Sequence, residues 1–286
     1  MIRSDNARGA LFMIAAMAAF AVEDAAIKAA STHLPLGQVL IAFGALGALA
    51  FNIYARAKDL PLYSAQALSP LMALRGVFEV AGRLFYCLAI VLIPLSHATV
   101  ILQATPVVVV AVAALFLGEQ VGLRRWGAVA LGFLGVLVTV QPGAEEFTAL
   151  SLLAVAGMLG FAGRDLISRA VPASMPISVL GFYGFVAITV AGFILLGWTG
   201  DAMGRVTAAS ALPILIAAAA GVLAYVCLMH AMRTGEVSAV TPLRYTRLLF
   251  GVALGVLLFG ETLEASTLLG GVLILLSGLI LTRRRA

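Results

Sequence analysis

The sequence has few charged residues and almost no cysteine. Of its 286 residues 11% are charged and 63% are hydrophobic, whereas a soluble domain carries roughly 25% charged residues. Mean hydropathy is +1.11. This composition excludes an ordinary soluble enzyme. Cys87 and Cys227 both lie inside apolar runs, so they form no disulfide framework and no metal-ligand spacing.

Catalytic and nucleic-acid-binding patterns are also missing. His97 and His230 have no second ligand or nucleophile at a useful spacing, and the chain has no HExxH or Gly-x-Gly-Asp run. The net charge of +5 comes from basic residues scattered over short loops, without an interleaved aromatic stacking surface. We therefore expect no enzymatic activity, no catalytic residue, no metal, no cofactor and no nucleic-acid partner.

Long apolar runs make up most of the chain. A transmembrane helix takes about 20 apolar residues, and the runs show no period-two alternation, which disfavours a β-barrel. The sequence predicts an all-α membrane protein with ten transmembrane helices. The predicted spans are 9–30, 36–55, 68–92, 97–117, 124–140, 149–169, 177–198, 211–232, 237–259 and 267–282.

The distribution of basic residues predicts the orientation of these spans. With the N-terminus inside, Arg205 is alone in the outer loops and Lys28 lies near an outer end. This asymmetry predicts a multi-pass protein of a bacterial-type inner membrane with both termini in the cytoplasm. The inner ends and loops then carry Arg3, Arg8, Arg56, Lys58, Arg124, Arg125, Arg169, Arg233, Arg283, Arg284 and Arg285.

The two halves of the chain resemble each other. Shifted by 141 residues, 15–30 aligns with 156–171, and shifted by 142 residues, 96–119 aligns with 238–261 without a gap. An alanine-rich composition could produce some of these identities, but the shared offset favours duplication. We predict two five-helix repeats, 1–143 and 144–286. Because five is odd, the second repeat enters the membrane from the opposite side, as in many secondary carriers.

Each half carries a Gly-Glu element after its fourth helix, Leu117-Gly118-Glu119 and Phe259-Gly260-Glu261. With two five-helix halves, the whole chain resembles the EamA family of the drug/metabolite transporter superfamily. The stretch 242–250 resembles a branch that includes metabolite carriers and amino-acid exporters. The resemblance implies a cavity among helices one, three, four, six, eight and nine, with helices five and ten behind.

The third span has a polar face. Arg75, Glu79 and Arg83 stand at i, i+4 and i+8, with Tyr86 close to the same stripe. Glu79 lies about 16 Å into the span, near the midplane of a ~30 Å core. Charges there are costly and mark transport pathways, so we expect these residues to bind substrate. Substituting Glu79 or Arg83 by Gln should then lower transport and leave folding nearly intact. The alternative is an intrahelical Glu79–Arg83 pair.

The ninth span adds Arg244 and Arg247 at i and i+3, with Tyr245 between them. A guanidinium binds carboxylate or phosphate through a planar fork, so the pair is a candidate anion site, with Tyr245 against the substrate. The alternative is that the arginines hold helices together or extend toward the inner surface.

Two further charge clusters lie toward opposite ends of the first and sixth spans. Ion pairs that form at one end of the transport pathway and break at the other would favour one state of a two-state rocking motion. The alternative is solvation of helix ends, which fits Glu23 and Arg169 better than the aspartates. The predicted gating residues are Asp24 and Lys28 on the outer side and Arg164 and Asp165 on the inner side.

The sequence thus predicts a carrier that exports small zwitterionic metabolites, with amino acids the best match, by alternating access. The alternative is uptake of a nucleoside- or vitamin-like metabolite. A membrane enzyme or a channel is disfavoured by the missing motifs and the duplicated, charged architecture. Expected partners are a small-molecule substrate and membrane lipid, and a monomer is compatible with the sequence.

Overall fold

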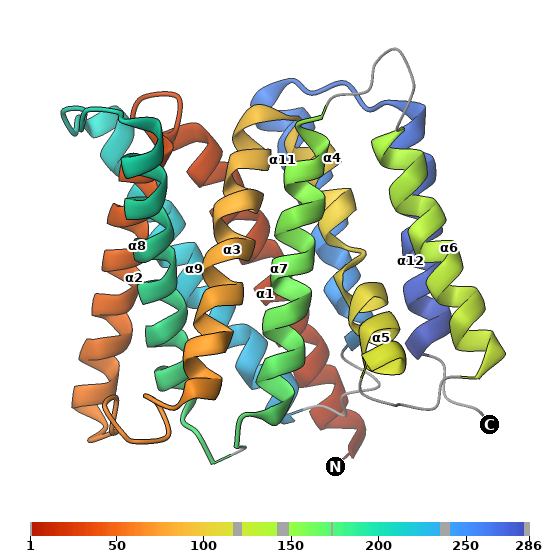
Figure 1. Cartoon of the computed structure of the whole chain (residues 1–286), viewed down its shortest axis with the longest axis horizontal. Coiled ribbons are helices and arrows are strands. Elements are labelled where there is room, and N and C mark those ends of the chain that lie inside the picture. The colour runs from red at the N-terminus through yellow and green to blue at the C-terminus, as the bar shows by residue number, and fades with distance from the viewer. Residues whose placement is uncertain (1, 117–121, 142–148, 173, 235–240, 283–286) are drawn as a thin grey trace.

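The computed structural model describes residues 2–116, 122–141, 149–172, 174–234 and 241–282, which contain helices and no strands. The helices stand side by side, and the chain runs back and forth between the two ends of the bundle (Figure 1). α1 begins and α12 ends at the same end. The fold is therefore an all-α bundle, as the sequence predicts.

Each predicted span coincides with a helix or with a pair of helical segments. The first half contains α1 (Ile2–Ala30), α2 (Leu36–Ala57), α3 (Pro70–Leu92), α4 (Leu95–Leu102), α5 (Thr105–Phe116) and α6 (Leu123–Val140). The second half contains α7 (Ser151–Ala170), α8 (Ile177–Thr199), α9 (Ala208–Thr234), the 3-10 turn η1 (Thr241–Tyr245), α11 (Thr246–Phe259) and α12 (Ala265–Thr282).

The fourth and ninth spans are interrupted. α4 ends at Leu102 and α5 begins at Thr105, directly before Pro106. Proline lacks the N–H that a continuous helix needs, and it disfavours helical backbone in the residue before it. In the other half the 3-10 turn that contains Pro242 precedes α11. Interrupted helices occur in transporters where the backbone lines a protected interior.

Length and composition mark six segments as able to cross a membrane: 7–30, 36–57, 95–112, 151–168, 177–199 and 208–231. Shorter apolar helices cover 126–140 and 265–280. Leu49, Ile53, Phe193 and Leu257 are among many large apolar side chains exposed on the bundle. Such a surface is expected where lipid chains are the solvent.

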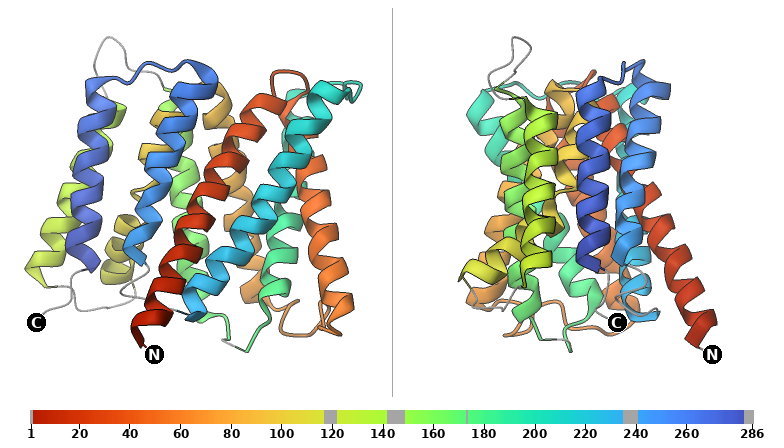
Figure 2. Two further views of the ribbon diagram at one scale, coloured as in Figure 1. Left: turned by 180° about the vertical axis from the view of Figure 1, so that it is seen from behind. Right: turned by 90° about the vertical axis from the view of Figure 1, so that its right-hand side faces the viewer.

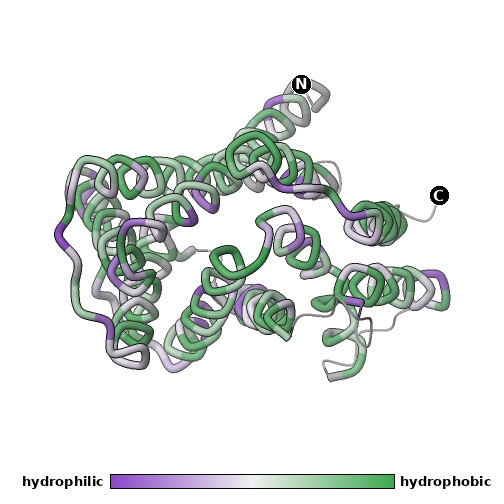
Figure 3. Tube along the Cα trace, turned by 90° about the horizontal axis from the view of Figure 1, so that it is seen from above, coloured by the Kyte–Doolittle hydropathy of each residue, from purple (hydrophilic) through white to green (hydrophobic). Residues whose placement is uncertain are grey.

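The helices pack in pairs that join the two halves. The main partners are α1 with α9, α2 with α8, α3 with α7, and α6 with α12, and smaller contacts join α1 with α11, α3 with α8, and α4 with α11. The α2–α8 pair lies at one edge of the bundle and the α6–α12 pair at the other (Figures 1 and 3). The remaining elements lie between these edges: α1, α3, α4, α5, α7, α9, η1 and α11.

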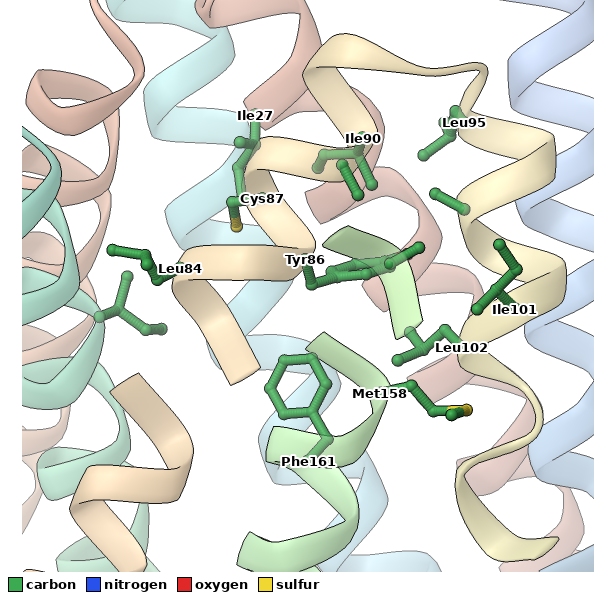
Figure 4. Close-up of a cluster of buried hydrophobic side chains, with 14 of the residues drawn as sticks. Ile27, Leu84, Tyr86, Cys87, Ile90, Leu95, Ile101, Leu102, Met158 and Phe161 are labelled. Atoms are coloured by element: carbon green, nitrogen blue, oxygen red, sulfur yellow. The ribbon is translucent and has the colours of Figure 1, made fainter. Parts of the chain in front are cut away.

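Glycines set the closest of these approaches. A Cβ added to Gly160 of α7 would collide with the backbone of Gly82 of α3. The two helices therefore touch backbone to backbone, which brings the polar stripe of α3 next to the charged residues of α7. Around this contact Tyr86 packs with Ile101 and Leu102 of α4 and with Met158 and Phe161 of α7 (Figure 4).

Candidate substrate-binding site

The polar stripe of α3 faces the protein interior. Arg75, Glu79 and Arg83 are 5%, 4% and 8% exposed, and Tyr86 is fully buried. Their spacing places them on one side of the helix, which faces α7 over the lower turns and α1 over the upper turns. The stripe is thus buried, and its charges need partners from other helices.

Asp24, on α1, lies at the centre of the first group of partners. Arg247 of α11 donates to its Oδ2 atom at 2.6 Å, and the hydroxyl of Tyr86 donates to the same atom at 3.1 Å. The neighbouring Glu23 accepts a hydrogen bond from Arg83. Both acids are 1% exposed. We call these five residues the central cluster. It holds two acids and two arginines, so its formal charges balance.

Aromatic rings surround the guanidinium groups of this cluster. Arg247 lies 5.0 Å from the ring centroid of Phe20 and 5.8 Å from that of Tyr86. Arg83 lies 5.9 Å from the ring of Phe43 and 5.7 Å from that of Phe161. Ring faces attract cations at these distances, so the arginines have favourable contacts besides their acidic partners.

Some polar atoms of the central cluster have no hydrogen-bond partner among the described residues. They are Oδ1 of Asp24 and the Nε atoms of Arg83 and Arg247. Buried polar atoms are usually hydrogen-bonded, and each exception calls for a reason. In this cluster one acceptor and two donors are thus left without a hydrogen-bond partner among the described residues.

A second cluster lies where α3, α7 and η1 meet. Glu79 contacts Arg75 at 3.4 Å and Arg164 at 3.1 Å. Asp165 contacts Arg164 at 2.8 Å and Arg244 at 3.9 Å. Arg75 also donates to the hydroxyl of Ser168 at 2.9 Å. With three arginines and two acids, this cluster has a formal excess of one positive charge.

These contacts contradict two of the alternatives. Arg83 pairs with Glu23 of α1 instead of forming an intrahelical pair with Glu79. Glu23 is also not a solvated helix-end residue, because it is 1% exposed. A charge pattern on one helix cannot identify partners on a neighbouring helix, and the missing information was that α1 lies against α3.

The predicted arginine pair of the ninth span is divided between the two clusters. Arg247 contacts Asp24, and Arg244 lies near Asp165. The 3-10 turn ends between them, which changes the direction of the side chains. Tyr245 lies apart from both clusters, since its ring lies where a Cβ on Gly278 of α12 would be. The structure gives Tyr245 a packing contact with α12 in place of the expected position against a ligand.

Lys28, in the last turn of α1, forms an ion pair of 3.1 Å with Glu261. The end of α1 lies at the opposite end of the bundle from its start (Figure 2). Glu261 also accepts hydrogen bonds from the backbone N–H groups of Leu95 at 2.6 Å and Ser96 at 3.0 Å. Burial raises the pKa of Glu261, but these amides, the Ser96 hydroxyl and Lys28 outweigh it, so the pKa lies below its usual value. The contacts join α1 and the α11–α12 connection to the N-terminus of α4.

Two of the expected landmarks fall outside the described residues. Glu119, the counterpart of Glu261 in the repeat, is one of them, and the side chain of Arg169 is the other. Within the described ranges no group of three or more His, Cys, Asp or Glu side chains is placed to hold a metal ion.

Comparison with known proteins identifies the family. The sequence model of the EamA-like transporter family matches residues 7–141 and again residues 149–283. The chain belongs to the EamA-like transporter family. It is therefore a multi-pass membrane transporter for a small-molecule substrate, and the resemblance carried by the Gly-Glu elements is confirmed.

Relatives with assigned functions are transporters of different substrates. The chain is 29% identical over 280 residues to the pseudopaline exporter CntI of Pseudomonas aeruginosa, covering 97% of this chain and 96% of that protein. It is 26% identical over 204 residues to an S-adenosylmethionine uptake transporter of Rickettsia bellii, covering 71% and 68%. A riboflavin transporter of Vibrio cholerae is 25% identical over 290 residues, covering 99% and 95%.

A solved crystal structure has the same fold. It superposes with a TM-score of 0.65 at 16% identity and covers 95% of this chain and 97% of the other. At this level of identity the likeness concerns the fold alone.

Proposed function

We propose that this family member is a secondary carrier that exports small zwitterionic metabolites, with amino acids the simplest class. The observation that carries the proposal is the central cluster, in which Asp24 and Arg247 pair at 2.6 Å and both keep an unused polar atom. A carboxylate group of the substrate would bind Arg247 and its ammonium group would bind Asp24. The ring of Tyr86 would contact the apolar part.

The charge balance favours a substrate with both signs. A ligand that carried only a carboxylate would take Arg247 and leave Asp24 buried without its cation. Leaving one buried charge without a partner costs about 3–5 kcal/mol. A zwitterion replaces both partners at once, so it avoids this cost.

We further propose that the chain consists of two inverted repeats, 1–143 and 144–286, that alternate access to the clusters. Three observations support this. The family model matches once in each half. The interruption at 103–104 and the 3-10 turn Thr241–Tyr245 lie in corresponding spans, the fourth and the ninth. In the two halves α1 corresponds to α7 and α3 corresponds to α9, so the α1–α9 contact and the α7–α3 contact are equivalent. The first helices of the halves, α1 and α7, run in opposite directions (Figure 1).

In this proposal both termini face the cytoplasm, because basic residues collect at that end of the predicted spans. Lys28 and Glu261 then close the outer end, while Arg164 and Asp165 lie toward the inner end. Asp24, which the sequence predicts as a gating residue beside Lys28, pairs with Arg247 in the central cluster, so we assign it to substrate binding. Forming and breaking these ion pairs would favour one open state over the other.

The test uses the purified full chain in proteoliposomes preloaded with radiolabelled methionine or phenylalanine. The free amino acid should compete for flux roughly ten- to a hundredfold better than its amide, because the amide lacks the charge-assisted contact to Arg247. Asp24→Asn and Arg247→Gln should each abolish most of the flux. Arg124→Gln is the matched control, since Arg124 is exposed on α6, away from both clusters.

Equal competition by acid and amide would contradict the proposed site. So would normal flux through Asp24→Asn. One relative is named an S-adenosylmethionine uptake transporter and another a riboflavin transporter, and these favour a second candidate, uptake of a nucleoside- or vitamin-like metabolite. Flux of riboflavin or S-adenosylmethionine without amino-acid flux would support that candidate over export of amino acids.

A further inference from the structure

A groove runs along the α2–α8 pair, and this pair lies at the edge of the bundle (Figures 1 and 3). Its volume is about 560 Å³, within the range of small-molecule sites. None of its lining residues belongs to the central or the second cluster. The groove is therefore separate from the candidate transport site.

Small residues explain why the groove does not close. Ala45 and Ala48 of α2 form part of its wall, and Phe182 and Phe193 of α8 lie across from them. Near the start of α2, a Cβ on Gly37 would collide with the backbone of α8. The helices thus touch closely there, and the small residues farther along α2 leave an apolar trough beside α8.

The trough has one basic end. Ala45, Ala48, Asn52 and Arg56 follow one face of α2 at helical spacing, so the stripe changes from apolar to polar to basic toward the end of the helix. Arg56 is exposed, and it forms no ion pair with any residue that the structure describes. An unpaired arginine in this position can bind an anion.

The dimensions match one leaflet of a bilayer. From Ala45 to Arg56 the helix rises about 16 Å, close to half of a ~30 Å hydrocarbon core. Tyr63, which is 69% exposed, packs edge-on against Phe182 with ring centroids 6.2 Å apart. Exposed tyrosines are typical of the membrane–water interface. Arg56 thus lies at the depth of lipid headgroups, and the trough extends from there into the acyl-chain region.

We propose that this groove binds an anionic phospholipid from the leaflet on the side where α1 begins. The phosphate and the anionic headgroup bind Arg56 and Asn52, and an acyl chain occupies the trough between α2 and α8. Basic pockets between transmembrane helices bind anionic headgroups in this way. The proposal does not depend on the identity of the transported substrate.

The test is native mass spectrometry of the purified full chain, titrated with phosphatidylglycerol or phosphatidylcholine of the same acyl chains. The parent protein should retain phosphatidylglycerol more strongly than phosphatidylcholine. Arg56→Gln should weaken phosphatidylglycerol binding about fivefold and remove the preference. Ala48→Phe should fill the trough and reduce the binding of both lipids. Arg124→Gln, which removes an exposed charge from α6, should leave binding unchanged.

Three results would overturn the proposal. The first is equal retention of the two lipids by the parent protein. The second is an equal loss in Arg124→Gln and Arg56→Gln, which would mean that only total charge matters. The third is that the parent protein forms a dimer, and that Ala48→Phe dissociates this dimer without changing lipid retention. The groove would then be the binding site of a second copy of the chain. Arg56 is exposed, so Arg56→Gln should fold normally even if Ala48→Phe does not.

Discussion

The ion pair between Glu23 and Arg83 should couple the stability of α1 to that of α3. Glu23 is 1% exposed and Arg83 is 8% exposed, and two phenylalanine rings lie within 6 Å of the guanidinium. Replacing either residue by Gln leaves the other charge buried and unpaired, which costs about 3–5 kcal/mol. Replacing both leaves two neutral amides that can hydrogen-bond to each other, so the double variant should be more stable than either single variant.

The assay is a double-mutant cycle on the full chain in mixed micelles, with unfolding followed by intrinsic fluorescence as the fraction of sodium dodecyl sulfate rises. The expected coupling free energy is about 3 kcal/mol, at the upper end of values for contacting residues. Arg124→Gln should unfold as the parent protein does. If the effects of Glu23→Gln and Arg83→Gln simply added in the double variant, the two residues would act independently and the reasoning from burial would be refuted.

Three further predictions follow from single contacts. Tyr86→Phe removes the hydrogen bond to the carboxylate of Asp24 on α1. It should cost about 1.5–3 kcal/mol, as for hydrogen bonds to charged groups, in the same unfolding assay, whereas an unchanged midpoint would show that this bond contributes nothing. Gly160→Val should prevent the close approach of α3 and α7, giving a loss of monodisperse protein in size-exclusion chromatography, and normal elution would contradict the contact. The lowered pKa of Glu261 means that its stabilising contacts are complete above its usual pKa near 4.3 and are lost as pH falls through the lowered value. Acid should therefore increase the labelling of a cysteine introduced next to Lys28. In the Glu261→Gln variant the labelling of this cysteine should be high at every pH.

The sequence alone determined the features that depend on local periodicity. Runs of about 20 apolar residues gave the spans, because a helix must cover the hydrocarbon core with satisfied backbone groups. The four-residue spacing of Arg75, Glu79 and Arg83 fixed their common face, since a helix turns once every 3.6 residues. The offset between the halves could also be read from the letters alone.

The tertiary structure alone decided which charges meet. The sequence predicts that Arg83→Gln folds nearly normally, whereas the contact with the buried Glu23 of α1 predicts a loss of stability. Arg244 and Arg247 were expected at one site, but the turn before Thr246 sends them to Asp165 and Asp24. The reason is that in an apolar interior a cation pairs with whichever acid lies beside it at the same depth. That acid is set by lateral packing between helices, and the spacing of residues along one helix does not record it.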